Sequence, residues 1–160
     1  MINDERGYTY LQGVYTMLFF LLLFVLVMNI AITIASYSRA HESIKNAMEA
    51  GVKEHYVTRD NDVYINEPDC VNDFFFFLRD NLKLDNSNMP IDSSIYTGQV
   101  VVEDIRFYRP GENCYMTGEV FNYPTMHTEV LIPIDILFSN LVGGQINMRI
   151  HHDVSYEDIL

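Results

Sequence analysis

Residues 8–36 read YTYLQGVYTMLFFLLLFVLVMNIAITIAS, and this stretch decides how the 160-residue chain is organised. Residues 14–35 contain no charge, and a helix needs about 20 predominantly apolar residues to cross the hydrocarbon core of a bilayer. Three tyrosines near its start lie where amphipathic rings anchor a helix at the headgroups: Tyr8, Tyr10 and Tyr15. The stretch therefore predicts a single-pass transmembrane helix in contact with membrane lipid, and a location at the cell membrane.

Two other interpretations of this stretch fit less well. A cleaved secretory signal would explain the small residues before Ser36, but the leading segment carries Arg6 against Asp4 and Glu5. Secretory signals usually begin with a basic region. A core helix of a soluble protein is disfavoured because the uncharged stretch is too long. A membrane anchor is the favoured interpretation.

The helix is expected to continue beyond the membrane. After Ser36 the sequence runs YSRAHESIKNAMEAGVKEHYV, with no proline before Pro68. Apolar or small residues recur in steps of three and four, which marks one helical face. This face contains Tyr37, Ala40, Ile44, Ala47, Gly51 and His55 or Tyr56. Small residues let another backbone approach closely, so the face packs on the chain's own domain, on neighbouring subunits, or on both. Ala40, Ala47 and Gly51 are candidate inter-subunit contacts.

Residues 58–69 are polar and rich in turn formers, and they predict a linker. A second helix is expected to begin at Pro68 or Asp69. Its apolar stripe consists of Val71, Phe74, Phe75, Leu78 and Leu82. Most of the four consecutive phenylalanines should be core, and Phe76 or Phe77 should project outward.

After a loop at 85–94, four segments rich in β-branched and aromatic residues predict an antiparallel sheet of about four strands. These segments are residues 98–108, 114–123, 129–138 and 145–156. Pro133 in the third segment indicates an edge strand or a bulge. The predicted fold class is α+β, in which a long N-terminal transmembrane helix continues as an amphipathic helix and packs on a small antiparallel sheet.

Charge and cysteine content limit the environment of the domain. The net charge is −12 and lies almost wholly after the anchor, and such an acidic surface repels nucleic acid. Cys70 and Cys114 either form one disulfide in an oxidising compartment or remain two buried thiols. Positive residues after the anchor, counted alone, would place the domain in the cytoplasm, whereas a disulfide would place it outside.

The sequence contains no motif of a known catalytic or nucleotide-binding site, such as GxSxG, HExxH, a P-loop or a dinucleotide fingerprint. Its one histidine-rich stretch is HHD at 151–153. Because neighbours on a strand point to opposite faces, His151 and His152 cannot bind one metal together without a kink. His127 could join one of them. We expect no enzyme activity, no metal and no cofactor.

The segment from Arg6 to Gln12, RGYTYLQ, resembles a type IV prepilin signal. In that family a short hydrophilic leader ends in glycine, an aromatic residue often follows, and a glutamate stands fifth after the glycine. A membrane-embedded prepilin peptidase cuts behind the glycine. The resemblance implies processing between Gly7 and Tyr8. It also puts Gln12 at the glutamate position, where the amide can accept a hydrogen bond but carries no charge.

The architecture is similar to that of the TadE-like proteins of Tad pilus systems. They have the same leader, one hydrophobic helix, an alanine-rich helical continuation and a small domain ending in strands. The match covers nearly the whole chain in architecture, but only residues 6–12 in motif. The resemblance implies a leader at 1–7, a transmembrane helix with its continuation at 8–58, and an extracytoplasmic α+β domain at 59–160.

These observations predict a structural subunit, a minor pilin or pseudopilin, that assembles into a pilus or secretion system. Its expected partners are membrane lipid, other pilin-like subunits and prepilin peptidase, and not nucleic acid. Gln12 and Asn29 are polar groups that are costly in hydrocarbon unless they find partners, so both are candidate inter-subunit contacts. The alternative is a signal-anchored extracytoplasmic binding or scaffold domain unrelated to pili, which predicts a concave apolar pocket in the sheet domain.

Overall fold

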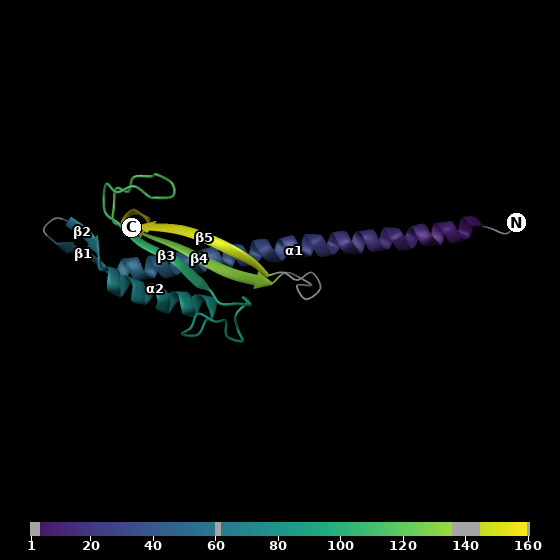
Figure 1. Ribbon diagram of the computed structural model, residues 1–160, viewed down its shortest axis with the longest axis horizontal. Helices are drawn as coiled ribbons and strands as arrows, with labels where there is room; N and C mark the ends of the chain where they lie inside the picture. Colours follow the sequence, from purple (N-terminus) through teal and green to yellow (C-terminus); the bar gives the residue numbers. More distant parts are fainter. Residues whose placement is uncertain (1–3, 60–61, 136–144, 160) are drawn as a thin grey trace.

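The computed structural model describes residues 4–59, 62–135 and 145–159, with side chains described for residues 10–58, 63–134 and 145–157. Its elements are α1 (Asp4–Glu54), β1 (Tyr56–Arg59), β2 (Asp62–Ile65), α2 (Glu67–Leu82), β3 (Val101–Tyr108), β4 (Thr125–Asp135), β5 (Gln145–Ser155) and the 3₁₀ helix η1 (Tyr156–Ile159). Figure 1 shows α1 as one long rod, with the other elements gathered around its C-terminal half. The predicted α+β class is confirmed.

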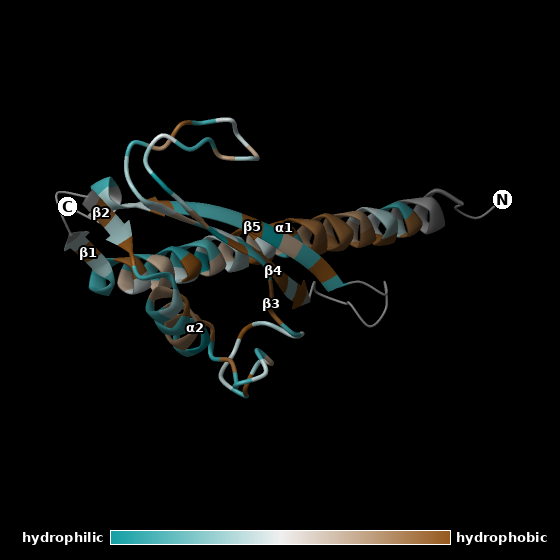
Figure 2. Ribbon diagram, turned by 60° about the vertical axis from the view of Figure 1, so that its left-hand side comes forward, coloured by the Kyte–Doolittle hydropathy of each residue, from teal (hydrophilic) through white to brown (hydrophobic). Residues whose placement is uncertain are grey.

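The N-terminal half of α1 stands apart from the rest of the chain. The helix contains 51 residues, which corresponds to a length of about 75 Å. No residue from Tyr10 to Arg39 is buried, and Figure 2 shows most of this part of the helix as strongly hydrophobic. We call residues 10–39 the apolar rod. The helix is long and apolar enough to span a membrane, and none of its most apolar 18-residue stretch is buried.

The C-terminal half of α1 forms one side of the domain core. Its fully buried apolar residues are Ala40, Ile44, Ala47, Met48 and Val52. The first three belong to the predicted face, whereas Met48 and Val52 were not predicted and Tyr37 is exposed. Helix α2 packs antiparallel against this face. Gly51 lies against the backbone of Cys70 and Phe74 at one end, and Asn81 Nδ2 donates a hydrogen bond of 3.1 Å to the Ser43 carbonyl at the other.

Helix α2 presents an apolar stripe to α1 and the sheet, namely Cys70, Phe74, Leu78 and Leu82. The predicted stripe is thus confirmed at its three innermost positions. Phe76 is 66% exposed, whereas Phe77 packs against the core. Of the two rings expected to project outward, Phe76 is therefore the one that does.

Strands β3, β4 and β5 form an antiparallel sheet in that order. The β4–β5 register runs from the Thr125↔Ser155 pair to the Asp135↔Gln145 pair. Alternate side chains of these two strands face the helices and are buried, namely Met126, Thr128, Val130, Ile132, Ile134, Met148, Ile150 and Val154. The Thr128 hydroxyl donates to Met48 Sδ at 3.0 Å, which ties the sheet to α1. The opposite face of the sheet is polar.

Two segments differ from the sequence prediction. Residues 58–69 were expected to be a linker, but they contain most of the β1–β2 hairpin and the start of α2. Residues 114–123 were expected to be a strand, but they belong to a loop. This loop turns at Gly118, whose φ of +72° favours glycine. The Cys114 amide then bonds back to the Glu119 carbonyl at 2.7 Å. The main sheet therefore has three strands in the described residues, and residues 136–138 of the expected third strand lie outside them.

Pro133 was expected to mark an edge strand or a bulge. It lies in β4, which is the central strand of the sheet, so the prediction of an edge strand is wrong. The register with β3 ends at the Val101↔Leu131 pair, however. Beyond Leu131, β4 pairs with β5 alone, so its other side resembles an edge, where a missing N–H costs little. Gly98 crosses this site so closely that an added Cβ would lie 2.8 Å from the Pro133 ring.

The contact at Gly51 gives the first testable prediction. A Cβ on Gly51 would lie 2.9 Å from the Cys70 carbonyl oxygen, which belongs to backbone, so the two helices must separate in Gly51→Ala. We expect the free energy of unfolding to fall by about 1–3 kcal/mol, measured by urea unfolding of the full chain in detergent. Gly13→Ala is the control, because nothing lies within 4 Å of the added atom. Equal midpoints for the two variants would contradict this account.

Candidate functional sites: the apolar rod and the polar sheet face

Three polar side chains of the apolar rod bond to the rod's own backbone. The Thr16 hydroxyl donates to the Gln12 carbonyl at 2.9 Å, Asn29 Nδ2 to the Val25 carbonyl at 3.1 Å, and the Thr33 hydroxyl to the Asn29 carbonyl at 2.9 Å. Each bond spans one helical turn and satisfies a polar group without solvent. The Gln12 side-chain amide differs, because it has no hydrogen-bond partner within the described part of the chain.

The sequence-predicted contact and processing residues fall into three groups. Gln12 and Asn29 lie on the rod, where Gln12 is exposed and Asn29 partly exposed. Ala40, Ala47 and Gly51 are instead covered by the chain's own α2 and sheet, which corrects their assignment as surfaces open to a neighbour. The backbone of Gly7 and Tyr8 lies within α1, and the Tyr8 side chain lies outside the described range.

Cys70 and Cys114 are both free and buried, so the disulfide alternative is not realised. Cys70 Sγ contacts Met126 Sδ at 3.7 Å on the helix-covered face of the sheet. Cys114 lies beside His127 and Asp153. Because Met126 and His127 are consecutive on β4 and point to opposite faces, the sheet separates the two thiols.

The outward face of the sheet carries a set of aligned ionisable side chains. We call it the polar sheet face and define it as Asp104, Arg106, His127, Glu129, Arg149, His151 and Asp153. The strand register aligns them in rows: one contains Arg106, His127 and Asp153, and the next contains Asp104, Glu129 and His151. Cross-strand neighbours on one face lie about 5 Å apart, so these groups interact directly.

Arg149 joins the three strands of this face. Its guanidinium lies 2.8 Å from a carboxylate oxygen of Glu129 on β4 and 3.0 Å from one of Glu103 on β3. The Glu129 side chain is largely buried, and burying a carboxylate is costly unless it is paired. Arg149 therefore neutralises the most buried acid of the polar sheet face.

The other row brings three potential ligands together where the loop 109–124 covers the sheet. The His127 ring donates through Nδ1 to Asp153 Oδ1 at 2.6 Å. This hydrogen bond and the Asp153 charge outweigh burial and raise the pKa of His127. The loop delivers Cys114, whose donor atom lies within 4.8 Å of those of His127 and Asp153. Burial raises the pKa of the Cys114 thiol, but hydrogen bonds from Thr117 and the Met116 backbone outweigh it, so the net pKa is lowered.

Sequence reasoning found only part of this cluster. His151 and His152 do point to opposite faces, as predicted: His151 stacks on His127, and His152 packs edge-on against His41 of α1. The cluster itself joins Cys114, His127 and Asp153 from a loop and two strands. No fixed spacing marks these three residues, and the loop was expected to be a strand. The strand alternation could have paired His127 with Asp153 only if the β4–β5 register had been known.

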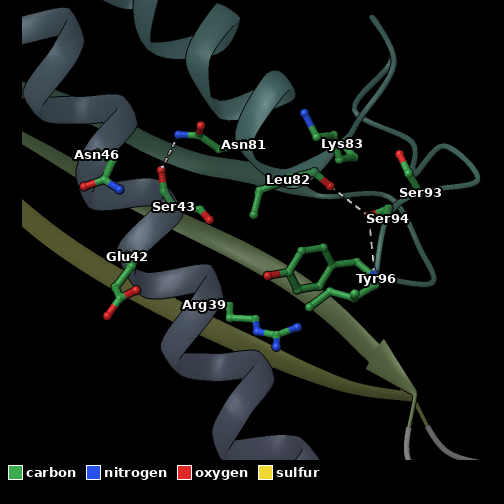
Figure 3. A pocket seen from close by; sticks show the side chains of 11 residues that line it. Arg39, Glu42, Ser43, Asn46, Asn81, Leu82, Lys83, Ser93, Ser94 and Tyr96 are labelled. Atoms are coloured by element: carbon green, nitrogen blue, oxygen red, sulfur yellow. Dashed lines mark hydrogen bonds between the residues drawn. The ribbon is translucent and has the colours of Figure 1, made fainter.

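A polar pocket of about 280 Å³ lies where the apolar rod enters the domain. Figure 3 shows Arg39 of α1 and Tyr96 of the loop between α2 and β3 pointing toward one another across it. Several of its polar groups are already bonded: Asn81 donates to the Ser43 carbonyl, and the Ser94 hydroxyl donates to the Leu82 carbonyl at 2.8 Å. These bonds hold α1, α2 and the 83–96 loop together, so the pocket is part of the domain's structure.

A second concavity of about 700 Å³ lies between the β1–β2 hairpin, the end of β3 and the loop 109–124. Its aromatic lining consists of Tyr64, Phe107, Tyr108 and Tyr123. The Tyr56 hydroxyl of β1 donates to the Pro124 carbonyl at 2.7 Å. This bond links the hairpin to the loop 109–124. The size of the concavity lies within the range of small-molecule pockets.

The chain was compared with known protein families, curated proteins and solved structures. The chain matches no protein-family model, no curated protein and no solved structure.

The Arg149 network gives the second prediction. In Arg149→Met the largely buried Glu129 loses its guanidinium partner, and we expect the free energy of unfolding to fall by about 1–3 kcal/mol. Lys45→Met is the matched control, because Lys45 pairs with Glu49 at 3.5 Å on an exposed helix surface; it should change stability by under about 0.5 kcal/mol. Adding Glu129→Gln to Arg149→Met should recover part of the loss. Equal destabilisation by Arg149→Met and Lys45→Met in urea unfolding would refute this role.

Proposed function

We propose that the chain is a membrane-anchored assembly subunit of a pilus or secretion system, resembling a TadE-like minor pilin or pseudopilin. The observation that carries this proposal is the division of one helix into two parts. From Tyr10 to Arg39 no side chain is buried, although most are apolar, whereas from Ala40 onward the helix forms the core of a folded domain. A rod of this kind needs lipid or other apolar helices around it.

The proposed domain orientation is extracytoplasmic, as the family resemblance implies. The role is structural: the rod packs among other helices in the membrane, and the acidic domain is displayed outside. Close contact between rods is expected near Gln12, because a polar side chain in a membrane helix is stabilised by a hydrogen bond across the interface. Thr16 needs no hydrogen-bond partner on a neighbouring rod, because its hydroxyl already bonds within the helix.

This difference gives the third prediction. Replacing Gln12 with Leu should weaken association between rods by about 0.6–2 kcal/mol, which is roughly a threefold to thirtyfold increase in the dissociation constant. Sedimentation of the full chain in detergent micelles measures it. Thr16→Val lies one turn away on the same side of the helix and should leave association unchanged. A monomeric wild type, or equal effects of the two variants, would argue against an inter-subunit role for Gln12.

Processing gives the fourth prediction. Co-expression with a prepilin peptidase should remove residues 1–7 and leave Tyr8 as the amino terminus, which intact-mass spectrometry detects. Gly7→Leu should abolish this cleavage, because a large side chain replaces the residue behind which the enzyme cuts. Gly13→Leu is the control, since Gly13 lies six residues beyond that junction. Wild-type chains that all retain Met1 would weigh against the pilin assignment.

The aromatic-lined concavity of about 700 Å³ favours the alternative function, a signal-anchored binding or scaffold domain unrelated to pili. That function predicts a different outcome in the same experiments: both Gly7→Leu and Gln12→Leu would leave the protein's maturation and association unaltered. The two variants therefore separate the two functions.

A further inference from the structure

The cluster of Cys114, His127 and Asp153 carries an inference that is independent of the proposed function. Its three donor atoms, a sulfur, a ring nitrogen and a carboxylate oxygen, lie within 4.8 Å of one another. The β4–β5 register makes His127 and Asp153 direct cross-strand partners, and the loop 109–124 brings Cys114 over them. Three different segments thus converge on one point.

One of the two ring nitrogens of His127 lacks a partner. Nδ1 bonds to Asp153, but Nε2 is buried and has no hydrogen-bond partner among the described residues. The whole residue is only 1% exposed, so water reaches this nitrogen poorly. A buried polar atom left without a partner is destabilising. With Nδ1–H donated to Asp153, the neutral ring presents the lone pair of Nε2 to a ligand.

The two cysteines differ in their suitability as metal ligands. The thiolate is the form that binds metal. Burial, with nearby Asp73 and Glu67, raises the pKa of Cys70 to about 12, so Cys70 remains a thiol. Of the two, only Cys114 is placed beside a histidine and a carboxylate.

We propose that Cys114, His127 and Asp153 form a binding site for a borderline-soft divalent cation, with Zn²⁺ the best match. Thiolate and imidazole are the ligands that zinc prefers, and carboxylate is a third. Cys114 Sγ and His127 Nε2 bind the ion, and Asp153 holds the ring in the required tautomer, as carboxylates do behind zinc-bound histidines. Water completes the coordination.

Burial favours a metal site here over a catalytic thiol. Cys114 is only 2% exposed, and the Tyr115 ring of the same loop lies edge-on to His127 at 5.6 Å between centroids. This cover keeps a substrate carbonyl from the sulfur, whereas the spacing of the donor atoms, within 4.8 Å, suits a small ion. A bound ion would also fasten the loop to the sheet, because its ligands come from both.

The test uses the full chain in detergent after removal of metal with a chelator. Titration with Co²⁺ should give one-to-one binding with the charge-transfer absorption of a cobalt–thiolate bond, and Zn²⁺ should displace it. Cys114→Ser should lose that absorption and weaken Zn²⁺ binding at least tenfold in calorimetry. His127→Gln should also weaken it at least tenfold, and Asp153→Asn about tenfold to a hundredfold.

Two control variants make the test specific. Cys70→Ala removes the other thiol and should leave the absorption unchanged. His55→Gln disrupts the more exposed Glu54–His55–Asp73 cluster, which has no sulfur, and should also leave Zn²⁺ affinity unchanged. Near-ultraviolet circular dichroism of each variant without metal checks that it is folded. The Co²⁺ titration of the wild type tests for the site even if a variant does not fold. No thiolate absorption in the wild type, or its loss in Cys70→Ala but not in Cys114→Ser, would overturn the proposal.

Discussion

The close contact between α1 and α2 at Gly51 holds the domain onto the helix that also forms the apolar rod. With no side chain at Gly51, the Cys70 carbonyl and the Phe74 backbone lie directly against α1. Further along the same face, Ala40 and Ala47 keep the surface of α1 flat enough to be covered completely. Close backbone approach of this kind maximises dispersion contacts. The sheet then closes over the two helices, and Thr128 and Met48 join it to α1.

The sheet separates two chemical environments. Its inner face is apolar and continuous with the helix core, and its outer face carries paired charges and the Cys114 cluster. Strand register enforces this separation, because a shift of one residue would exchange every side chain between the faces. The eleven aligned pairs of β4 and β5 therefore specify both the core and the position of His127 opposite Asp153. A stable core and a chemically competent outer surface arise from the same alternation.

The parts of the fold with a strong local pattern could be predicted from the sequence. The uncharged stretch at 14–35 indicated the rod, the stripe through Phe74, Leu78 and Leu82 indicated α2, and alternation indicated β5. Segments whose structure depends on distant partners could not be predicted. The β1–β2 hairpin has only four residues in each strand. The loop 109–124 contains residues with high strand propensity, although Gly118 turns it back on itself.

The candidate sites show the same limit. The rod with Gln12 was visible because its signal is local, but Ala40, Ala47 and Gly51 were ambiguous, since small residues permit packing on any neighbour. The structure assigns them to the chain's own α2 and sheet. The Cys114 cluster was missed because its members come from three segments, and their proximity follows from the register and from a loop whose course the sequence pattern did not reveal.

The placement of the two thiols on opposite sides of the sheet has a consequence for where the domain can fold. No disulfide can form between Cys70 and Cys114 while the sheet lies between them. The native state therefore needs no oxidant, and glutathione has no cross-link to reduce. The redox poise of a compartment does not decide whether this domain folds, so the same architecture is attainable on either side of a membrane.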